Sequence, residues 1–540
     1  MRHITDDNQL YAKLLYGGIL CLLLATILLI AVPPISRDAL IHHLAIPKLY
    51  LQHGGIFEIP NLEFSYYPMN LDLLYMVPLS FGNDIIPKFI HFIFALGTAW
   101  LIYDFLKRNL TKTYGLLGSF FFLSIPVILK LSITVYVDLG LIFFSTASLL
   151  LLFRWSEEKF QPRYLIFAGI SCGLAMSTKY NGLITFLILS AFVPLLYQRV
   201  SATTNNFVAL RWGIIFFAVA LLTFSPWMIR NFMWTGNPLY PLFENFFHPG
   251  AHSARPILGI FKIRQFMYHE TPLQILLLPL RIFFEGRDNV PQFFDGKLNP
   301  FLLVLPVFAF ISSKNSPVNR QKIFLALFCF LFFFIATFET SMRIRYIAPI
   351  IPSLVILAIF GLHNLHSLFQ NKKIGTSLVG VLTIAMLAYN GNYLIDQFKI
   401  VQPLSYISGK ICRDEYITRF RPEYPVIQFA NQSADDKEQT LCLFMGHRGY
   451  YMDFHHTFDT PGQPKSYFSS IVSKSNSPNA IRATLSGAGY TKILLYNKVT
   501  EKWLQNMQQH KKTTILFFQH ELELMYTAGG YTLFHIKDDH

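Results

Sequence analysis

The chain has 540 residues, of which 14% are charged, whereas about 25% is usual in a soluble domain. Because 53% of the residues are hydrophobic, a large part of the chain must avoid water. The net charge of +14 does not indicate a nucleic-acid partner, since many cations lie in short loops beside apolar runs. Cations in such loops orient membrane spans and contact anionic headgroups. The composition therefore predicts an integral membrane protein, with membrane lipids among its partners.

The apolar runs are long enough to cross a bilayer, which takes about 20 residues. The first run ends in Pro33-Pro34 without a small-residue cleavage pattern, and we interpret it as an uncleaved signal anchor. A run at residues 273–284 is too short to cross and is predicted to be interfacial or re-entrant. We predict about eleven spans, at residues 14–34, 85–106, 113–131, 138–153, 163–178, 182–198, 210–228, 299–313, 321–338, 345–366 and 374–395.

Loop charges orient these spans. With the N-terminus in the cytoplasm, every short inner loop carries Lys or Arg, as the positive-inside rule requires. An odd number of spans then places the C-terminus outside the cytoplasm. Two outer loops are long, at residues 36–84 and 230–298. The first contains two amphipathic stretches, 38–51 and 67–81, which we expect to lie as helices in the plane of the interface.

The last part of the chain has the composition of a soluble domain. The pattern predicts a membrane domain over residues 1–400 and an extracytoplasmic α/β domain over 401–540. Expected in the latter are strands at 440–444 and 492–496, a helix at 481–487, and a hairpin formed by 521–525 and 531–536.

Two features of this predicted domain are open to alternative interpretations. The stretch GHRGYYMDFHH (446–456) is either a sugar-stacking loop or a turn packed on the domain core. Cys412 and Cys442 either pair in an oxidising compartment or stay free, because the sequence does not show whether they are close together.

Two aspartates lie at the predicted outer edge of the membrane. Asp38 follows the first span, and Asp138 opens the fourth. A carboxylate in this position is unfavourable unless it is functional or paired, although Asp is also favoured as a helix N-cap. On a helix, Asp38 and His42 would share a face. His42 and His43 are thus candidates for metal binding, acid–base chemistry or substrate hydrogen bonds, or are simply interfacial surface.

Several cations are predicted on the outer side, against the positive-inside trend. Arg and Lys near headgroups suit a phosphate or pyrophosphate, and the alternative is ordinary lipid anchoring. With the neighbouring aromatic residues they suit a lipid-linked phosphate substrate and a reaction that needs a general base. The candidate substrate-binding residues are His42, His43, Tyr66, Tyr67, Lys179, Tyr180, Arg230, Asn237, Tyr240, Arg343, Arg345 and Tyr346.

Six short segments, all on the predicted outer side, carry a family resemblance. They are RDALIHHLAIPKLYL (37–51), YYPMNLDLLYMVPL (66–79), VYVDLGLIFF (135–144), STKYNGL (177–183), RNFMWTGNPLYP (230–241) and RIRYIAPIIP (343–352). In this order the chain resembles the GT-C membrane glycosyltransferases, above all the branch that contains protein O-mannosyltransferases and the aminoarabinose transferase of lipid A. The resemblance spans about 400 residues, the whole predicted membrane domain.

The resemblance implies a site and a reaction. The donor would be a polyprenyl-phosphate-linked sugar, Asp38 the catalytic base and Asp138 an assisting acidic residue. The mannosyltransferases have Asp-Glu in the first loop, whereas Ala39 follows Asp38 here, so Glu58 or Glu63 would have to supply a second acid. The acidic motifs of the metal-dependent oligosaccharyltransferases are not found, so no obligatory metal or other cofactor is expected.

The chemistry agrees with this resemblance. An acceptor hydroxyl or amine attacks the anomeric carbon, a carboxylate takes its proton, and cations stabilise the departing polyprenyl phosphate. We therefore expect an inverting hexosyl or pentosyl transferase of a bacterial inner membrane, with a periplasmic C-terminal domain. A transporter or flippase for a lipid-linked sugar, which would usually show internal repeats, and a non-catalytic assembly subunit are the alternatives. The sugar and the acceptor, whether protein, lipid or glycan, stay open.

Overall fold

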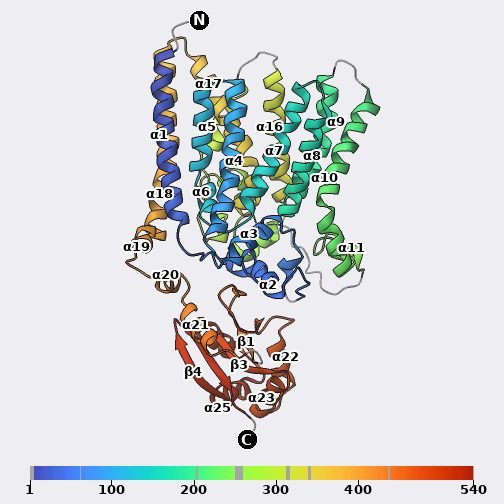
Figure 1. Ribbon diagram of the computed structural model, residues 1–540, viewed down its shortest axis with the longest axis vertical. Helices are drawn as coiled ribbons and strands as arrows, with labels where there is room; N and C mark the ends of the chain where they lie inside the picture. The colour runs from blue at the N-terminus through green and yellow to red at the C-terminus, as the bar shows by residue number, and fades with distance from the viewer. Residues whose placement is uncertain are drawn as a thin grey trace. The chain divides into compact units, whose positions relative to one another are not determined.

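The structure is a computed structural model that describes residues 5–60, 62–201, 205–249, 260–311, 317–337, 342–435 and 438–538. The chain forms two compact units (Figure 1). The first contains Met1–Ala31 and His53–Pro403, and the second contains Val32–Gln52 and Leu404–His540. The start of the first predicted outer loop thus groups with the C-terminal region, whereas the sequence assigned it to the membrane domain.

In its described residues the first unit consists of helices and loops. The longer helices are α1 (Thr5–Ile30), α3 (Asn70–Ser80), α4 (Ile86–Asn109), α5 (Lys112–Ser124), α7 (Asp138–Glu157), α8 (Pro162–Thr178), α9 (Gly182–Val200), α10 (Asn206–Thr235), α16 (Pro317–Thr337), α17 (Ile351–Leu368) and α18 (Lys372–Val401). The shorter ones are η2 (Glu63–Tyr66), α6 (Pro126–Ser132), α11 (Glu244–Phe247), α12 (Ile260–Tyr268), α13 (Pro272–Leu276), α14 (Leu278–Arg281), η3 (Pro291–Phe293), α15 (Phe301–Phe308) and η4 (Ile344–Ile350).

The apolar runs form the spans of a multi-pass membrane protein. Within the described residues, eight helices are long and apolar enough to cross a membrane, or nine if the bent pair α5–α6 is one span. Three of the eleven predicted spans therefore do not appear as single long helices. The run at 113–131 bends by 67°, because Pro126 lacks the N–H that would continue α5. The run at 163–178 forms α8, of 17 residues, and the run at 299–313 forms α15, of only 8 residues.

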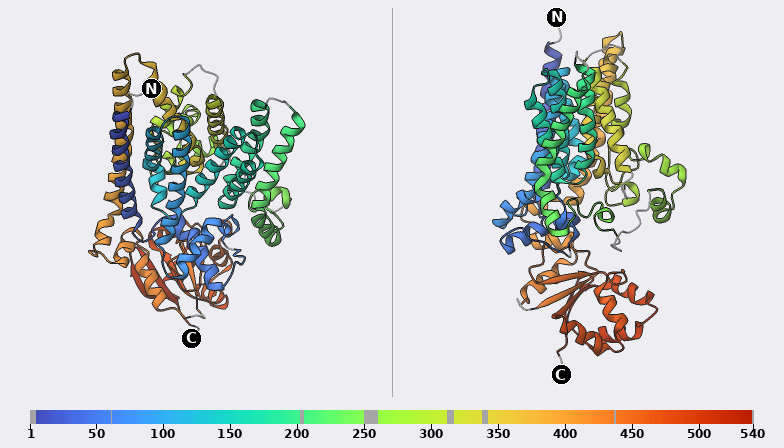
Figure 2. Two further views of the ribbon diagram at one scale, coloured as in Figure 1. Left: turned by 45° about the horizontal axis from the view of Figure 1, so that its top comes forward. Right: turned by 90° about the vertical axis from the view of Figure 1, so that its right-hand side faces the viewer.

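The helices α7 and α17 form the centre of this bundle. Their most apolar segments are 72% and 83% buried, whereas those of α1 and α18 are 22% and 17% buried. The last two lie side by side at one edge of the bundle (Figure 2). The N-terminal ends of α7 and of the η4–α17 segment are thus held by protein rather than by lipid, which makes them rigid positions for polar groups.

The second unit contains a five-stranded mixed sheet. Its strands are β1 (Gln439–Leu443), β2 (His456–Asp459), β3 (Tyr490–Tyr496), β4 (Leu522–Ala528) and β5 (Tyr531–Ile536), in the order β2-β1-β3-β5-β4. β1 pairs in parallel with β2 and β3, and β5 pairs antiparallel with β3 and β4. The predicted strands and hairpin are present, and β2 was missed because its four residues, HTFD, carry no apolar run.

Both faces of the sheet are covered, since successive side chains of a strand point to opposite sides. Leu441 and Leu443 pack on one side with α22 (Tyr467–Lys474), α23 (Pro478–Gly487) and α25 (Lys511–His520). Cys442 points to the other side, where α21 (Tyr424–Gln432) packs. Cys412 is exposed at the N-cap of α20 (Arg413–Phe420), and both cysteines are free. The C-terminal part of the chain also contains α19 (Pro403–Ile407) and α24 (Asn497–Asn506).

The segment 32–52 forms the π-helix η1 (Ala39–His43) and the helix α2 (Ala45–His53, whose last residue belongs to the first unit). The single helix predicted over 38–51 is thus wrong in this respect. Pro47 lies in the first turn of α2, where no intrahelical N–H bond is required. The second predicted interfacial helix, 67–81, appears as α3.

A loop of the C-terminal region holds this segment. The Lys48 ammonium donates to the carbonyl oxygens of Tyr450 at 2.8 Å and Met452 at 3.0 Å, and to Asp453 Oδ1 at 2.6 Å. The Tyr450 N–H donates to the Leu40 carbonyl at 3.1 Å. The hydroxyl of Tyr451 donates to Pro34 O at 2.7 Å, and Arg421 donates to Ile35 O. We refer to Lys48 with residues 450–453 as the clamp.

The clamp explains part of the GHRGYYMDFHH stretch. Tyr450, Tyr451 and Met452 contact segment 32–52 through their backbones or side chains. The stretch is therefore engaged within its own unit, as the packed-turn interpretation requires.

Replacing Lys48 by Met is expected to loosen the clamp. The substitution keeps the length of the side chain but leaves two carbonyl groups and Asp453 without their donor, at a cost of about 1–3 kcal/mol. Hydrogen exchange of the Tyr450 amide should accelerate accordingly. Lys474→Met, which removes an exposed lysine of α22, is the control, and equal exchange rates in the two variants would contradict this account.

Candidate functional site

A buried ion pair links the start of α7 to the end of α8. Asp138 is the first residue of α7, and its side chain is 1% exposed. Its Oδ1 accepts a hydrogen bond from Lys179 Nζ at 2.7 Å. Its Oδ2 is buried and has no hydrogen-bond partner among the described residues. One oxygen of this carboxylate is thus held by Lys179, whereas no hydrogen bond satisfies the other within the described residues.

His91 of α4 fixes the position of this carboxylate. Its Nδ1 lies 3.0 Å from the carbonyl oxygens of Leu131 and Thr134, and its Nε2 accepts from the Leu139 N–H at 2.9 Å. Because carbonyl groups only accept, Nδ1 carries the proton and the imidazole is neutral. The ring thus satisfies an N–H in the first turn of α7, which has no intrahelical acceptor. Sequence reasoning missed His91, although a lone His in an apolar run was a visible signal.

The segment η4 adds one cation, Arg345, and the ring of Tyr346 beside Asp138 and Lys179. The Lys179 ammonium lies over the Tyr346 ring, 5.2 Å from its centroid. The Arg345 guanidinium lies over the rings of Tyr136 and Tyr346, at 5.2 and 5.4 Å, and its charge acts on Asp138. We refer to Asp138, Lys179, Arg345 and Tyr346 as the acid–cation cluster. Its net charge is +1, which suits an anionic ligand.

Arg343 is turned to a different partner. Its Nη1 forms an ion pair with Asp295 Oδ2 at 3.3 Å. The neighbouring Ile344 N–H donates to the Phe294 carbonyl at 2.8 Å. Arg343 therefore joins η4 to the loop between α10 and α15, beside the acid–cation cluster.

A second group of the residues that were predicted to bind substrate surrounds Asn231. Its Nδ2 donates to Tyr66 O at 2.8 Å and to the Tyr180 hydroxyl at 3.0 Å. Tyr180 in turn donates to Tyr240 O at 2.8 Å. The rings of Tyr66 and Tyr240 are in contact, as are those of Tyr67 and Tyr180. Because Tyr180 directly follows Lys179 in the sequence, this aromatic group adjoins the acid–cation cluster.

Arg230 serves this second group structurally. Its Nη2 donates to the carbonyl oxygens of Tyr66 and Tyr67 at 2.7 and 3.2 Å. Its guanidinium lies between the rings of Trp227 and Trp234, 4.4 and 4.7 Å from their centroids. These contacts hold the segment that immediately precedes α3.

Asn237 is likewise committed to structure. Its Nδ2 donates to Leu242 O and to Glu244, and it is fully buried.

Two further carboxyl groups, Asp72 and Glu58, lie near these aromatic residues. Burial raises the pKa of Asp72, in the first turn of α3, well above its ordinary value, and the charge of Lys179 acts in the opposite direction. Glu58, considered as a second acid, accepts a hydrogen bond from the Tyr66 hydroxyl at 2.6 Å. Burial and this bond raise the pKa of Tyr66. Asp72 was missed although it breaks an apolar run.

Asp38, His42 and His43 belong to the second unit, so the structure describes them separately from Asp138. Asp38 precedes η1, and its side chain makes no capping hydrogen bond. The rings of His42 and His43 are in contact, with centroids 4.0 Å apart. Among the described residues no three His, Cys, Asp or Glu side chains gather as metal ligands.

The sequence was compared with models of known protein families and with curated proteins. Residues 81–229, which include Asp138 and Lys179, match the family model of dolichyl-phosphate-mannose-protein mannosyltransferase. No curated protein sequence matches the chain.

Solved structures resemble the whole chain at low sequence identity. The apo crystal structure of ArnT from Cupriavidus metallidurans is 12% identical, with a TM-score of 0.61 and 98% of both chains covered. The same protein bound to undecaprenyl phosphate gives a TM-score of 0.60 at 12% identity, covering 97% of this chain and 98% of that one. The oligosaccharyltransferase AglB of Archaeoglobus fulgidus, with an inhibitory peptide and a dolichol-phosphate, gives 0.50 at 12% identity, covering 97% and 74%.

The resemblance predicted from the sequence is thus confirmed at the level of the fold. The chain has the fold of the membrane glycosyltransferases ArnT and AglB, and its residues 81–229 match the family model of dolichyl-phosphate-mannose-protein mannosyltransferase.

Proposed function

We propose that the chain is an inverting glycosyltransferase that moves a sugar from a polyprenyl-phosphate donor to an acceptor outside the cytoplasm. The observation that carries the proposal is the acid–cation cluster, in which a buried carboxylate with one unpartnered oxygen adjoins Lys179 and Arg345. Support comes from two proteins of the same fold, one bound to undecaprenyl phosphate and the other to a dolichol-phosphate.

In the proposed reaction a single displacement transfers the sugar. The oxygen or nitrogen of the acceptor forms a bond to the anomeric carbon while a carboxylate takes its proton. The bond from the anomeric carbon to the phosphate oxygen breaks, and its electron pair stays on the phosphate. One displacement inverts the anomeric configuration.

The charges have separate roles in this scheme. Asp38 is proposed as the general base, following the family resemblance, and Asp138 orients the acceptor and holds Lys179. Lys179 and Arg345 stabilise the charge that grows on the leaving phosphate, which is the interaction that differs most between ground state and transition state. The lipid carrier and a polar acceptor meet at the membrane edge, where these helix ends lie.

Asp38→Asn is expected to lower transfer by at least about 100-fold, because a positioned base contributes about 10²–10⁴-fold. Asp138→Asn is expected to lower transfer as well, because it removes the charge that holds Lys179. The assay supplies radiolabelled polyprenyl-phosphate sugars and membrane extract to the purified protein in detergent. Asp396→Asn, at an exposed position of α18, is the control. Donor binding without transfer by the wild type under any condition would favour a flippase or an assembly subunit.

Arg345→Gln is expected to lower kcat by about 10²–10³-fold, the effect of removing one transition-state donor. The KM for the donor should change much less, because the charge on the phosphate is largest in the transition state. Arg320→Gln, which removes a half-buried arginine that donates to Arg199 O, should leave both constants unchanged. An equal loss in both variants, or a pure KM effect of Arg345→Gln, argues against the assigned role.

Treatment with EDTA followed by gel filtration is expected to leave the transfer rate unchanged, because Lys179 and Arg345 supply the positive charge that a metal would otherwise provide. The rate is measured before and after chelation, and after addition of Mg²⁺ or Mn²⁺. A loss that either ion restores would refute the metal-independent scheme.

A further inference from the structure

The segment between α10 and α15 forms most of the lining of an open cavity, which lies outside the acid–cation cluster. Its volume is about 760 Å³, within the range of about 300–1,000 Å³ that is usual for small-molecule sites. Residues 268–297 provide most of the walls, and Tyr389 of α18 completes them. None of the candidate residues predicted from the sequence lines this cavity.

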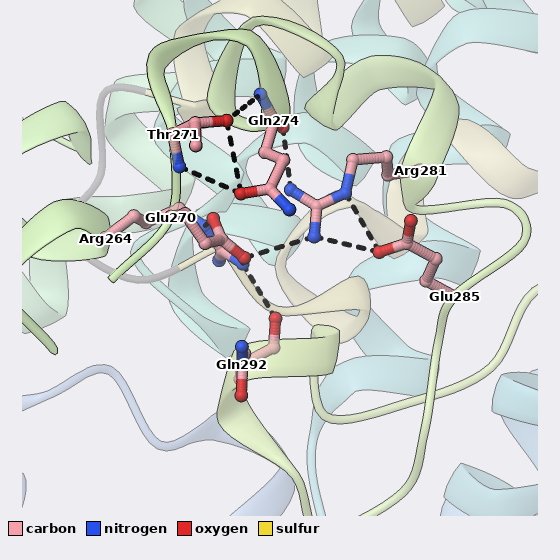
Figure 3. Close-up of polar contacts among 7 residues, drawn as sticks. All are labelled: Arg264, Glu270, Thr271, Gln274, Arg281, Glu285 and Gln292. Carbon is pink, nitrogen blue, oxygen red and sulfur yellow. Dashed lines mark hydrogen bonds and ion pairs between the residues drawn. The ribbon is translucent and has the colours of Figure 1, made fainter. Parts of the chain in front are cut away.

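A buried ion network holds the walls in place (Figure 3). Arg264 donates to both oxygens of Glu270, at 2.5 and 2.8 Å, and to Gln292 O at 2.7 Å. Arg281 lies between Glu270 and Glu285, at 3.1 and 2.8 Å. Arg264 and Glu270 are only 2% and 5% exposed. Although burial acts to raise the pKa of Glu270, the hydrogen bonds from the two arginines outweigh it and hold that pKa low.

The network is neutral, and the net positive charge that faces the cavity comes from two other residues. Its two arginines and two glutamates cancel one another. Arg287 and Lys297 also line the cavity, and neither forms an ion pair with any residue that the structure describes. Their contacts are with aromatic rings, Arg287 over Phe293 at 4.6 Å and Lys297 over Tyr389 at 4.9 Å. Two cations thus remain for a ligand, which favours an anion.

The cavity is too large for an isolated phosphate group. Its aromatic lining, from Tyr268, Phe293 and Tyr389, offers flat faces to an organic portion, and the amides of Gln274 and Gln292 offer donors and acceptors. Aromatic faces beside planar polar groups suit a sugar ring. The lining therefore matches a phosphate attached to a larger polar group better than it matches a free ion or an apolar chain.

The cavity is also connected to the proposed site. Phe294, which contacts both Arg264 and Arg281, accepts the hydrogen bond from the Ile344 N–H. Asp295 binds Arg343. One wall of the cavity thus continues into η4, which carries Arg345 and Tyr346. A ligand held in the cavity would lie next to the residues that are proposed to act on the donor.

We propose that this cavity binds a phosphate-bearing saccharide or headgroup of a substrate, through Arg287 and Lys297. The assignment rests on the proposed function for the identity of its ligand, and adds a binding site to it. The phosphate belongs either to a phosphorylated saccharide of the acceptor or to the isoprenoid carrier. The shared chemistry is a phosphate monoester or diester beside a polar group.

The test is calorimetric titration of the full chain in detergent with glucose, glucose 1-phosphate and farnesyl phosphate. At least one phosphate should bind ten times more tightly than glucose, and less tightly as salt rises. Binding of glucose 1-phosphate alone identifies a saccharide phosphate, and binding of farnesyl phosphate alone identifies the carrier. Equal binding of glucose, or no phosphate binding, overturns the proposal.

Three variants connect this binding to the cavity. The double variant Arg287→Gln/Lys297→Gln should weaken phosphate binding at least tenfold, whereas Arg287→Lys/Lys297→Arg, which keeps the charges, should retain most of it. Lys262→Gln removes an exposed cation of the same loop that does not line the cavity, and should bind as the wild type does. Unchanged binding in the double variant overturns the assignment.

A further variant separates this proposal from the proposed function. Asp138→Asn should lose transfer and keep phosphate binding in the cavity. If the wild type transfers no sugar but the cavity variants behave as expected, the binding site stands and the enzyme assignment fails. If transfer proceeds while the double variant binds phosphate normally, the cavity assignment fails alone.

Discussion

The fold of the first unit depends on the buried pair of Asp138 and Lys179. A charge removed from water is strongly unfavourable unless a partner compensates it. The two residues lie at the ends of neighbouring antiparallel helices, α7 and α8, so they meet only when these ends are level. The pair therefore fixes the relative height of the two helices, and His91 fixes the first turn of α7 in the same place. Tyr346 and Arg345 pack onto an arrangement that is already rigid.

Most other polar residues near the helix ends follow the same constraint. Arg230 is occupied by backbone carbonyls and tryptophan rings, Arg343 by Asp295, and Arg281 by two glutamates. Such residues stabilise loops that have too few apolar side chains to form a core. Arg287 and Lys297 differ from these residues, because neither forms an ion pair within the part of the chain that the structure describes. The position of a charged residue at the membrane edge is thus a weak indication of function. A charged residue that forms no ion pair within the described residues is a stronger candidate.

Sequence reasoning predicted what depends on local pattern. Apolar runs predicted the long helices, and Asp138 and Lys179 were recognised because they break such runs. The bend at Pro126 and the short α15 were missed, because hydropathy reports burial in apolar surroundings and not helix continuity. The ion network of Arg264, Glu270 and Arg281 was also missed, because its members pair through a loop conformation that no periodicity encodes. Likewise, the grouping of residues 32–52 with the C-terminal region depends on the contacts of Lys48, some 400 positions away.

This separation along the chain has a consequence for biosynthesis. Lys48 and Tyr450 are 402 positions apart, so at about 5–20 residues per second the ribosome needs roughly 20–80 s to make the partner of the first loop. The bundle helices enter the membrane during that interval, while the segment that carries Asp38 lacks its clamp. The segment reaches its final form only when translation has almost finished. A chain interrupted before residue 450 would contain the residues of the bundle helices and of the acid–cation cluster but would lack the clamp on residues 32–52, so completion of synthesis gates the assembly of this segment.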